Sequence, residues 1–192
     1  MAPKTRFSYG EYAAGEAASA IKHEFLDGDV YAMAGGSITH AALVMALSVA
    51  IGGQLRGKPC RAYSSDLRVR IVEGNVATYP DLSVVCGPVL SDPEDPHCAL
   101  NPTVIVEVLS DGTEAYDRGD KFAAYRRISS LKEYLLVSQH SVSIERFARN
   151  ADDSWTLTAA GPGSVLTLAS LSCDLAVDEI YRDLDLPVRV RT

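Results

Sequence analysis

One carboxylate interrupts the most apolar segment of the chain. Glu107 lies in the middle of TVIVEVL, residues 103–109, a run with apolar residues on both faces of the strand that it predicts. Such a strand is central in its sheet and covered on both sides, so the carboxylate faces an interior where an unpaired charge is costly. A compensating group is therefore expected, and for a single buried Glu an Arg or Lys partner is the structural explanation.

Two more acids stand at the starts of predicted strands. Asp81 follows Pro80 and opens DLSVV, and Asp66 opens LRVRI. Adjacent carboxylates raise each other's pKa unless a cation lies between them. A hard divalent ion, Mg²⁺ or Mn²⁺, prefers oxygen ligands and leaves positions for water and a phosphate oxygen. The acids thus indicate metal-assisted phosphoester chemistry, with a capping role for Asp81 and a salt bridge from Asp66 to Arg68 or Arg70 as the structural alternatives.

The elements that position these residues alternate between helices and strands. A capping box at Ser8 and Glu11 predicts a helix ending near Ala18. Asp27–Gly28 predicts a hairpin turn, which an apolar helix over residues 39–56 follows. The remaining pattern predicts a half-exposed strand over 67–71, strands over 76–79, 81–85, 103–109, 133–138 and 142–148, a helix over 118–128, a terminal hairpin of 155–159 with 165–169, and a helical turn at 177–181. No repeat or linker divides this order, so we expect one α/β domain over residues 1–192, a sandwich around a mixed sheet.

Three segments resemble the Uma-two family. They are HEFLDGDVYAMAGGS at residues 23–37, TYPDLSVVCGP at 78–88, and the long block from NPTVIVEVLS to KEYLLVS at 101–138. The resemblance covers residues 10–181. That family is similar in fold to the PD-(D/E)XK restriction-endonuclease-like superfamily, which implies a central mixed β-sheet flanked by helices.

The resemblance also implies roles for four residues. Asp81 matches the aspartate of the PD motif and Glu107 the second acid, both as Mg²⁺ ligands, while Glu24 matches a recurrent glutamate that binds the metal directly or through water. The superfamily's lysine normally lies two positions after the second acid, where this chain has Leu109. The chain is similar to a variant in which the lysine lies on the following helix, and Lys121 fits that place. There it would orient the attacking water or neutralise the scissile phosphate.

Each of these assignments has a structural alternative. Lys121 is equally a residue type for a solvated helix face, and Glu24 for an exposed charge opposite a hairpin turn. His40, on an apolar helix, is more often packed and hydrogen-bonded than a base. Tyr125, one helical turn after Lys121, is expected in the core or in contact with a site residue.

The charge balance limits the kinds of partner. The chain has 192 residues, 25 acidic against 18 basic, and a formal charge of -7. This excludes a protein that coats nucleic acid through bulk positive charge. Residues 56–70 and 118–149 are nevertheless basic, each with a net charge of +4. These two stretches either follow a phosphate backbone or form solvated faces.

The cysteines and the N-terminal sequence indicate a compartment. Cys60, Cys86, Cys98 and Cys173 lie far apart with no CxxC pair, so we expect neither a zinc module nor a redox pair but reduced, buried thiols. The N-terminus lacks the apolar stretch of a signal peptide, and the longest apolar run, residues 41–53, is shorter than the roughly 20 residues that cross a bilayer. A cytoplasmic protein without a membrane segment is expected.

The leading functional hypothesis is a Mg²⁺- or Mn²⁺-dependent endonuclease that hydrolyses DNA phosphodiester bonds, and the resemblance implies a homodimer. Leu109 in the usual lysine position and the acidic total motivate an alternative, a non-catalytic member of the same fold that binds nucleic acid or a protein. A metal-dependent hydrolase of another phosphoester is a third possibility, because fold does not fix substrate.

Overall fold

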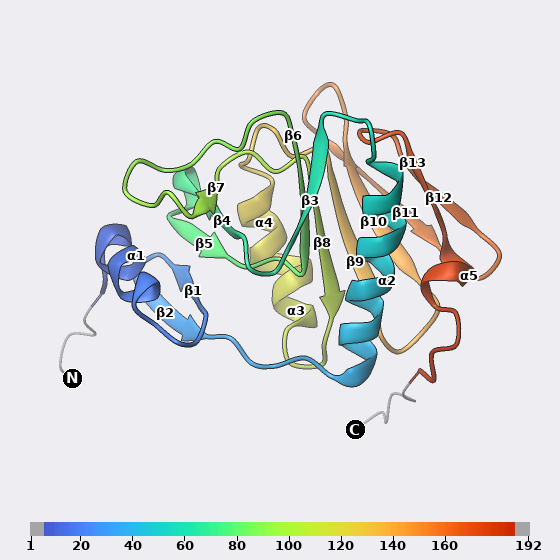
Figure 1. Ribbon diagram of the computed structural model, residues 1–192, viewed down its shortest axis with the longest axis horizontal. Coiled ribbons are helices and arrows are strands. Elements are labelled where there is room, and N and C mark those ends of the chain that lie inside the picture. Colours follow the sequence, from blue (N-terminus) through green and yellow to red (C-terminus); the bar gives the residue numbers. More distant parts are fainter. Residues whose placement is uncertain (1–5, 187–192) are drawn as a thin grey trace.

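Two β-sheets share an apolar core in the computed structural model, which describes residues 6–186 (Figure 1). The larger sheet has the order β11-β10-β9-β8-β6-β3 and consists of β3 (Cys60–Ser64), β6 (Leu82–Cys86), β8 (Val104–Leu109), β9 (Glu133–Ser138), β10 (Ile144–Arg149) and β11 (Trp155–Ala160). The smaller has the order β2-β1-β5-β4-β7 and consists of β1 (His23–Leu26), β2 (Asp29–Ala32), β4 (Arg68–Ile71), β5 (Val76–Thr78) and β7 (Cys98–Ala99). Strands β12 (Val165–Leu168) and β13 (Cys173–Ala176) form a separate antiparallel pair.

Helices cover both faces of the larger sheet. The helices are α1 (Tyr9–Ala17), α2 (Ile38–Gln54), α3 (Glu114–Tyr116), α4 (Phe122–Tyr125) and α5 (Val177–Ile180), with a 3₁₀ turn at Val72–Gly74 and a π-helical turn at Asp117–Lys121. Ser37 caps α2, which buries Leu43, Leu47 and Ile51 at four-residue spacing against one face of the sheet. The segment α3–α4 and the smaller sheet pack on the other face (Figure 1).

Strand β8 divides its side chains between these two layers. Val104, Val106 and Val108 belong to the core beneath α2, whereas Ile105 and Leu109 belong to the core beneath α4. Because successive side chains of a strand point to opposite faces, Glu107 must point toward α4. The whole strand is buried, as its apolar sequence predicts.

The mixed α/β architecture predicted from the sequence is confirmed, but one predicted pairing is wrong. Residues 155–159 and 165–169 were expected to form a hairpin with each other. In the structure β11 instead pairs antiparallel with β10, and β12 pairs with β13. Both pairings satisfy the same period-two pattern, so the pattern alone does not choose between neighbours in the chain.

Strand β4 is fully buried rather than half-exposed as predicted. Helix α1 covers the outer side of the smaller sheet with aromatic rings, and the Arg70 guanidinium carbon lies 3.7 Å from the ring centroid of Tyr9. Arg68 Nη2 lies 2.6 Å from Asp95 Oδ2, and the same carboxylate accepts a 2.6 Å hydrogen bond from the Tyr9 hydroxyl. The arginines are therefore buried because a carboxylate and aromatic faces replace their water. Arg68 does not pair with Asp66, whose Oδ1 lies 2.5 Å from Lys22 Nζ instead.

The buried Arg68–Asp95 pair leads to a prediction on stability. Burial alone would raise the pKa of Asp95. The hydrogen bonds from Arg68 and Tyr9 lower it by more than burial raises it, so the pKa is below its ordinary value. We expect Asp95→Asn to lower the free energy of unfolding by about 3 kcal/mol at pH 7, because Arg68 loses its buried counter-ion. The carboxylate contributes above its unfolded pKa of about 3.9, and that contribution is lost as the pH falls through the lower folded value.

Urea unfolding at pH 7 and at several values below pH 4 measures this effect. The gap between wild type and Asp95→Asn should narrow as the medium is acidified. Glu94→Gln, which replaces an exposed acid on the same loop, is the matched control and should leave the free energy of unfolding unchanged. A gap that is the same at every pH would show that the carboxylate charge does not stabilise the fold.

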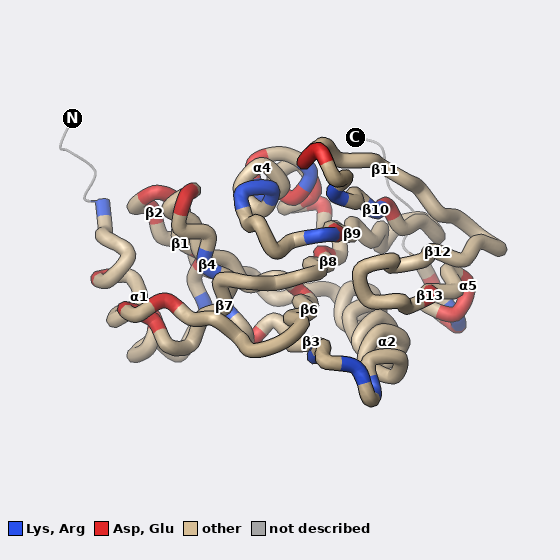
Figure 2. The backbone as a smooth tube through the Cα atoms, turned by 90° about the horizontal axis from the view of Figure 1, so that it is seen from above, with Lys and Arg blue, Asp and Glu red and all other residues tan. Residues whose placement is uncertain are grey.

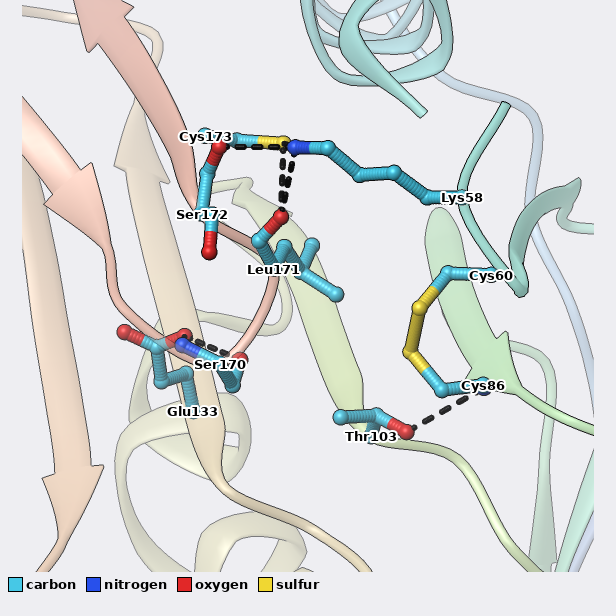
Figure 3. Close-up of a disulfide and its surroundings, with 9 residues drawn as sticks. All are labelled: Lys58, Cys60, Cys86, Thr103, Glu133, Ser170, Leu171, Ser172 and Cys173. Atoms are coloured by element: carbon cyan, nitrogen blue, oxygen red, sulfur yellow. Dashed lines mark hydrogen bonds between the residues drawn. A yellow bond between two sulfur atoms is a disulfide. The ribbon is translucent and has the colours of Figure 1, made fainter. Parts of the chain in front are cut away.

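The expectation of four reduced cysteines is wrong for two of them. Cys60 and Cys86 form a disulfide between β3 and β6 (Figure 3). Cys98 and Cys173 are free and buried. The two partners are 26 residues apart in the sequence, but the antiparallel register places Cys60 directly opposite Cys86. Register between distant strands cannot be obtained from cysteine spacing, so the pair was not recognised.

No helix within residues 6–186 is long and apolar enough to cross a membrane. The longest apolar run, residues 41–53, is part of α2, which spans 17 residues and packs on the larger sheet.

Candidate active site

Strand register brings Asp81 and Glu107 together. Strands β6 and β8 are antiparallel with Leu82 opposite Val106, so the next pair in the ladder is Asp81 with Glu107. Asp81 Oδ2 accepts a 2.7 Å hydrogen bond from the Val108 amide, and the Asp81 amide lies 3.4 Å from Glu107 Oε2. Asp81 thus has a positional role at the strand end, as the structural alternative proposed, and its carboxylate also lies next to the second acid.

Lys121 reaches the same place from the helical segment. Its Nζ lies 3.0 Å from Glu107 Oε1, 3.2 Å from Glu24 Oε1 and 3.4 Å from Asp117 Oδ1. Its side chain is only 7% exposed, so it does not lie on a solvated helix face. Residues 117–121 form a π-helical turn, a widening that is common at functional sites, and the turn places Asp117 and Lys121 on the same side.

Glu24 lies in the same cluster, at the end of the smaller sheet. Alternation along β1 puts Phe25 into the aromatic cluster under α1 and Glu24 on the opposite face. The Glu24 side chain is 12% exposed, and its Oε1 also lies 3.4 Å from the Tyr79 amide. It is therefore not an exposed hairpin charge. All four residues expected from the sequence are brought together.

Sequence reasoning missed one buried member of this cluster. Asp117 is 4% exposed and pairs with Lys121. The four-residue spacing from Asp117 to Lys121 was the available signal, because residues at this spacing share a helix face.

His40 joins the start of α2 to Asp81. It was expected to be packed and hydrogen-bonded, and its Nε2 does lie 3.2 Å from Asp81 Oδ2. Ser37 Oγ caps the His40 amide and donates to Gln139 Oε1, while Gln139 Nε2 donates to the Leu109 carbonyl. Asp81 in turn accepts from the Val108 amide. The start of α2 is therefore connected to two adjacent residues of β8, to Val108 through Asp81 and to Leu109 through Gln139.

The carboxylates in this cluster outnumber the cations. Among the residues that line the cavity, Lys121 is the single Lys or Arg. The acids on the same wall are four: Glu24, Asp81, Glu107 and Asp117. Burial, together with the neighbouring carboxylates, raises the pKa of Glu107 to about 8. Burial alone would lower the pKa of Lys121, but Glu107, Glu24 and Asp117 outweigh it and hold that pKa well above its usual value. The lysine is therefore a stable cation, and a further cation would relieve the remaining negative charge.

These residues line a cavity of about 470 Å³, which also borders the segment 33–36 and the loop 110–113. No three His, Cys, Asp or Glu side chains within residues 6–186 are already spaced as a metal site. The donor set nevertheless fits a hard divalent ion, because carboxylate oxygens on a cavity wall with excess negative charge are what Mg²⁺ and Mn²⁺ prefer. Asp81 and Glu107 would be the first ligands, since they lie side by side.

Tyr125 supports the second acid from beneath. Its hydroxyl donates a 2.8 Å hydrogen bond to Glu107 Oε1 and lies 2.9 Å from Thr78 Oγ1, and its ring is fully buried. We expect Tyr125→Phe to weaken Mn²⁺ binding or activity by about 10- to 100-fold, because groups that orient a metal ligand have effects of this size. Tyr134→Phe is the matched control, since Tyr134 is also fully buried but donates to the Asp117 carbonyl.

Isothermal titration with Mn²⁺ measures the Tyr125 effect, and thermal unfolding checks that both variants fold. Equal losses in Tyr125→Phe and Tyr134→Phe would mean that the hydroxyl acts only on core stability.

Comparisons with known proteins show the family of the chain. The family model Uma2, described as "Putative restriction endonuclease", matches residues 9–180. The chain belongs to the Uma2 family. It is 40% identical to "Uncharacterized protein slr1290" of Synechocystis over 95% of both chains, and 32% identical to "Uncharacterized protein sll1609" of the same organism over 77% of this chain and 84% of that one.

A solved structure shares the fold of this Uma2 chain. It is described as a "putative nuclease belonging to DUF820" from Anabaena variabilis, with a TM-score of 0.70, 13% sequence identity, and coverage of 85% of this chain and 91% of that one. At this identity the likeness establishes the fold. The mixed-sheet nuclease fold expected from the sequence is thus confirmed, and the family description makes nucleic acid the expected class of substrate.

The basic stretches do not form one phosphate-binding track. Arg68 and Arg70 are buried, so the first stretch is exposed mainly near the connection from α2 to β3. In Figure 2 the blue segments at this connection and those around α4 lie at opposite edges of the molecule. In the second stretch Arg118 pairs with Glu114 and Glu145, and Arg149 donates to the Arg126 and Ile128 carbonyls.

Proposed function

We propose that this Uma2 protein is a Mg²⁺- or Mn²⁺-dependent nuclease that hydrolyses phosphodiester bonds of DNA. The observation that carries the proposal is the position of Lys121, whose Nζ lies 3.0 Å from Glu107 Oε1 although the usual lysine position holds Leu109. The π-helical turn thus supplies the cation that the strand lacks. The family description and the nuclease fold support the same reaction class.

The side chains divide the chemistry as follows. Asp81 and Glu107 would hold the metal ion, with Glu24 as a direct or water-mediated ligand. A bound divalent ion would polarise the phosphate and lower the pKa of a water molecule. Lys121 is held cationic by Glu107, Glu24 and Asp117, which favours neutralisation of charge on the phosphate over abstraction of a proton. Tyr125 and the Val108 amide keep the two acids in place.

Cleavage of supercoiled and linear DNA by the purified protein tests the proposal. Products should appear with Mg²⁺ or Mn²⁺ and disappear with a chelator, and an Asp81→Ala preparation purified in parallel excludes a contaminating nuclease. If wild type binds Mn²⁺ in titration but cleaves no DNA, another phosphoester is the substrate. If it binds no metal and cleaves no DNA, the protein is a non-catalytic member of the fold, whether or not it binds nucleic acid.

A further inference from the structure

A second cavity, of about 520 Å³, adjoins the candidate active site. Both cavities are bordered by the segment 33–36 and share His40 and Asp81. The rest of the second wall comes from the segment just before β1, from the loop before β4 and from the exposed side of α2. A chain molecule that places one group at Asp81 can therefore place its neighbouring group in the second cavity.

The two cavities differ in charge. The first carries four carboxylates around Lys121, whereas Asp81 is the single acid among the described residues that line the second. Lys22 is also on the second wall, paired at 2.5 Å with Asp66, whose side chain is 81% exposed. Such a solvent-exposed pair contributes little, so a phosphate can compete for the ammonium group. The second cavity thus accepts a phosphodiester without the carboxylate repulsion that the first would exert in the absence of metal.

Solvent-exposed apolar side chains line this second cavity. Met45 is 64% exposed and Ile21 is 60% exposed, and both line the cavity. Large exposed apolar groups beside a cavity indicate a ligand-binding surface. A flexible thioether packs well against flat aromatic groups, and a nucleobase has such a face.

The segment between the cavities is thin because it contains Gly35 and Gly36. A Cβ added at Gly36 would lie 2.7 Å from His40 Nδ1, so glycine at this position leaves the room that the histidine ring occupies. A Cβ at Gly35 would meet no atom within 4 Å, so the backbone there borders open space. A strand of nucleic acid can therefore approach this segment closely.

We propose that the second cavity binds the nucleotide next to the scissile phosphate, with its base against Met45, and that the preferred substrate is consequently DNA that is single-stranded at the cleavage point. This inference rests on the proposed nuclease function. A base in a duplex is stacked and paired, and it can enter a side cavity only after leaving the helix. An unpaired strand has no such cost, and stacking of its bases on protein side chains is tolerant of sequence.

Two substitutions on α2 separate this site from the rest of the helix surface. Met45 and Val49 lie one helical turn apart, with exposed fractions of 64% and 66%, but Val49 is outside the cavity wall. We expect Met45→Glu to weaken binding of a fluorescein-labelled single-stranded oligonucleotide by about tenfold or more, and Val49→Glu to leave it within about twofold. The assay is fluorescence anisotropy with Ca²⁺ in place of Mg²⁺, so that binding is measured without cleavage.

An abasic oligonucleotide locates the contact. Removing the base next to the scissile phosphate should weaken binding to wild type by about tenfold but should add little to the loss in Met45→Glu, because the two changes remove the same contact. Cleavage of a single-stranded substrate should also exceed cleavage of the matching duplex, and this preference should fall in Met45→Glu while it persists in Val49→Glu.

The possible results are distinct. If wild type and Met45→Glu bind the oligonucleotide equally, the inference is overturned while the nuclease function stands. If Met45→Glu and Val49→Glu lose binding equally, and gel filtration shows that both change the oligomeric state, the face of α2 joins copies of the chain and the inference is again overturned. If wild type binds no oligonucleotide and cleaves no DNA, the proposed function itself has failed.

Discussion

Replacing Glu107 with Gln is expected to abolish DNA cleavage while making the metal-free protein more stable at alkaline pH. The substitution removes a ligand of the proposed metal, and stabilisation of the transition state by a metal ion is worth several kcal/mol, so the rate should fall by about a thousandfold or more. Mn²⁺ binding measured by titration should be lost with it. The amide keeps the size of the side chain and can still accept a hydrogen bond from Tyr125.

The gain in stability follows from the raised pKa of Glu107. Burial holds that pKa at about 8 in the folded protein, against about 4.3 in an unfolded chain. The folded state therefore binds more protons than the unfolded state between these values, and the stability of wild type falls as the pH rises through that window. Glutamine does not ionise, so the difference in unfolding free energy between Glu107→Gln and wild type should grow from pH 5 to pH 8.

Glu133→Gln is the matched control for this pattern. Glu133 is also buried in a strand, on β9 directly beside β8, but its partners are Ser170 and Arg146. Its replacement should lower stability by about 1 to 3 kcal/mol because these partners lose an acceptor, and should leave the cleavage rate and Mn²⁺ affinity of the folded protein unchanged. A Glu107→Gln protein that still cleaves DNA would remove Glu107 from the proposed chemistry.

The sequence indicated which residues lie together in the candidate site better than it indicated how the strands pair. Glu107 lies in a fully apolar strand and Asp81 opens another. Burial of a carboxylate costs free energy, so an acid at such a position indicates a special role even without knowledge of its neighbours in space. Strand pairing is a property of two segments at once, and local pattern cannot choose the partner. For this reason the predictions of a hairpin over residues 155–169 and of reduced Cys60 and Cys86 were wrong. Each predicted strand lies within a few residues of an observed one, but β3, β7 and β13 were not predicted.

Buried arginines were missed for a related reason. In β4 the alternation of Arg68 and Arg70 with apolar residues has the period of a half-exposed strand. Burial depends on Asp95 and on the rings of α1, which lie far away in the chain and are brought there by the fold. The periodicity of a strand indicates which residues share a face. Whether that face is exposed to solvent depends on tertiary contacts.

Replacing Lys121 with Met should lower the cleavage rate by about 10²- to 10⁴-fold, because a positioned cation that neutralises developing charge has an effect of this size. It should also lower the metal-free unfolding free energy by about 3 to 5 kcal/mol, because the acids around Lys121 lose the cation that they share. Thermal unfolding with and without Mn²⁺ measures the second effect. Mn²⁺ should raise the melting temperature of Lys121→Met more than that of wild type, since a bound cation replaces the missing charge.

Arg118→Met provides the control for Lys121, because Arg118 is a cation on the same π-helical turn but faces Glu114 and Glu145. It should cleave DNA at the wild-type rate and show the wild-type response to Mn²⁺. If Lys121→Met instead retains full activity, Lys121 serves only to neutralise Glu24, Glu107 and Asp117. The lysine missing from position 109 would then have no functional replacement, and the proposed metal site at Asp81 and Glu107 would account for cleavage without a positioned lysine. If Lys121→Met loses activity and Mn²⁺ restores its stability but not cleavage, a cation of either kind stabilises the fold, whereas cleavage requires the ammonium group of Lys121 itself.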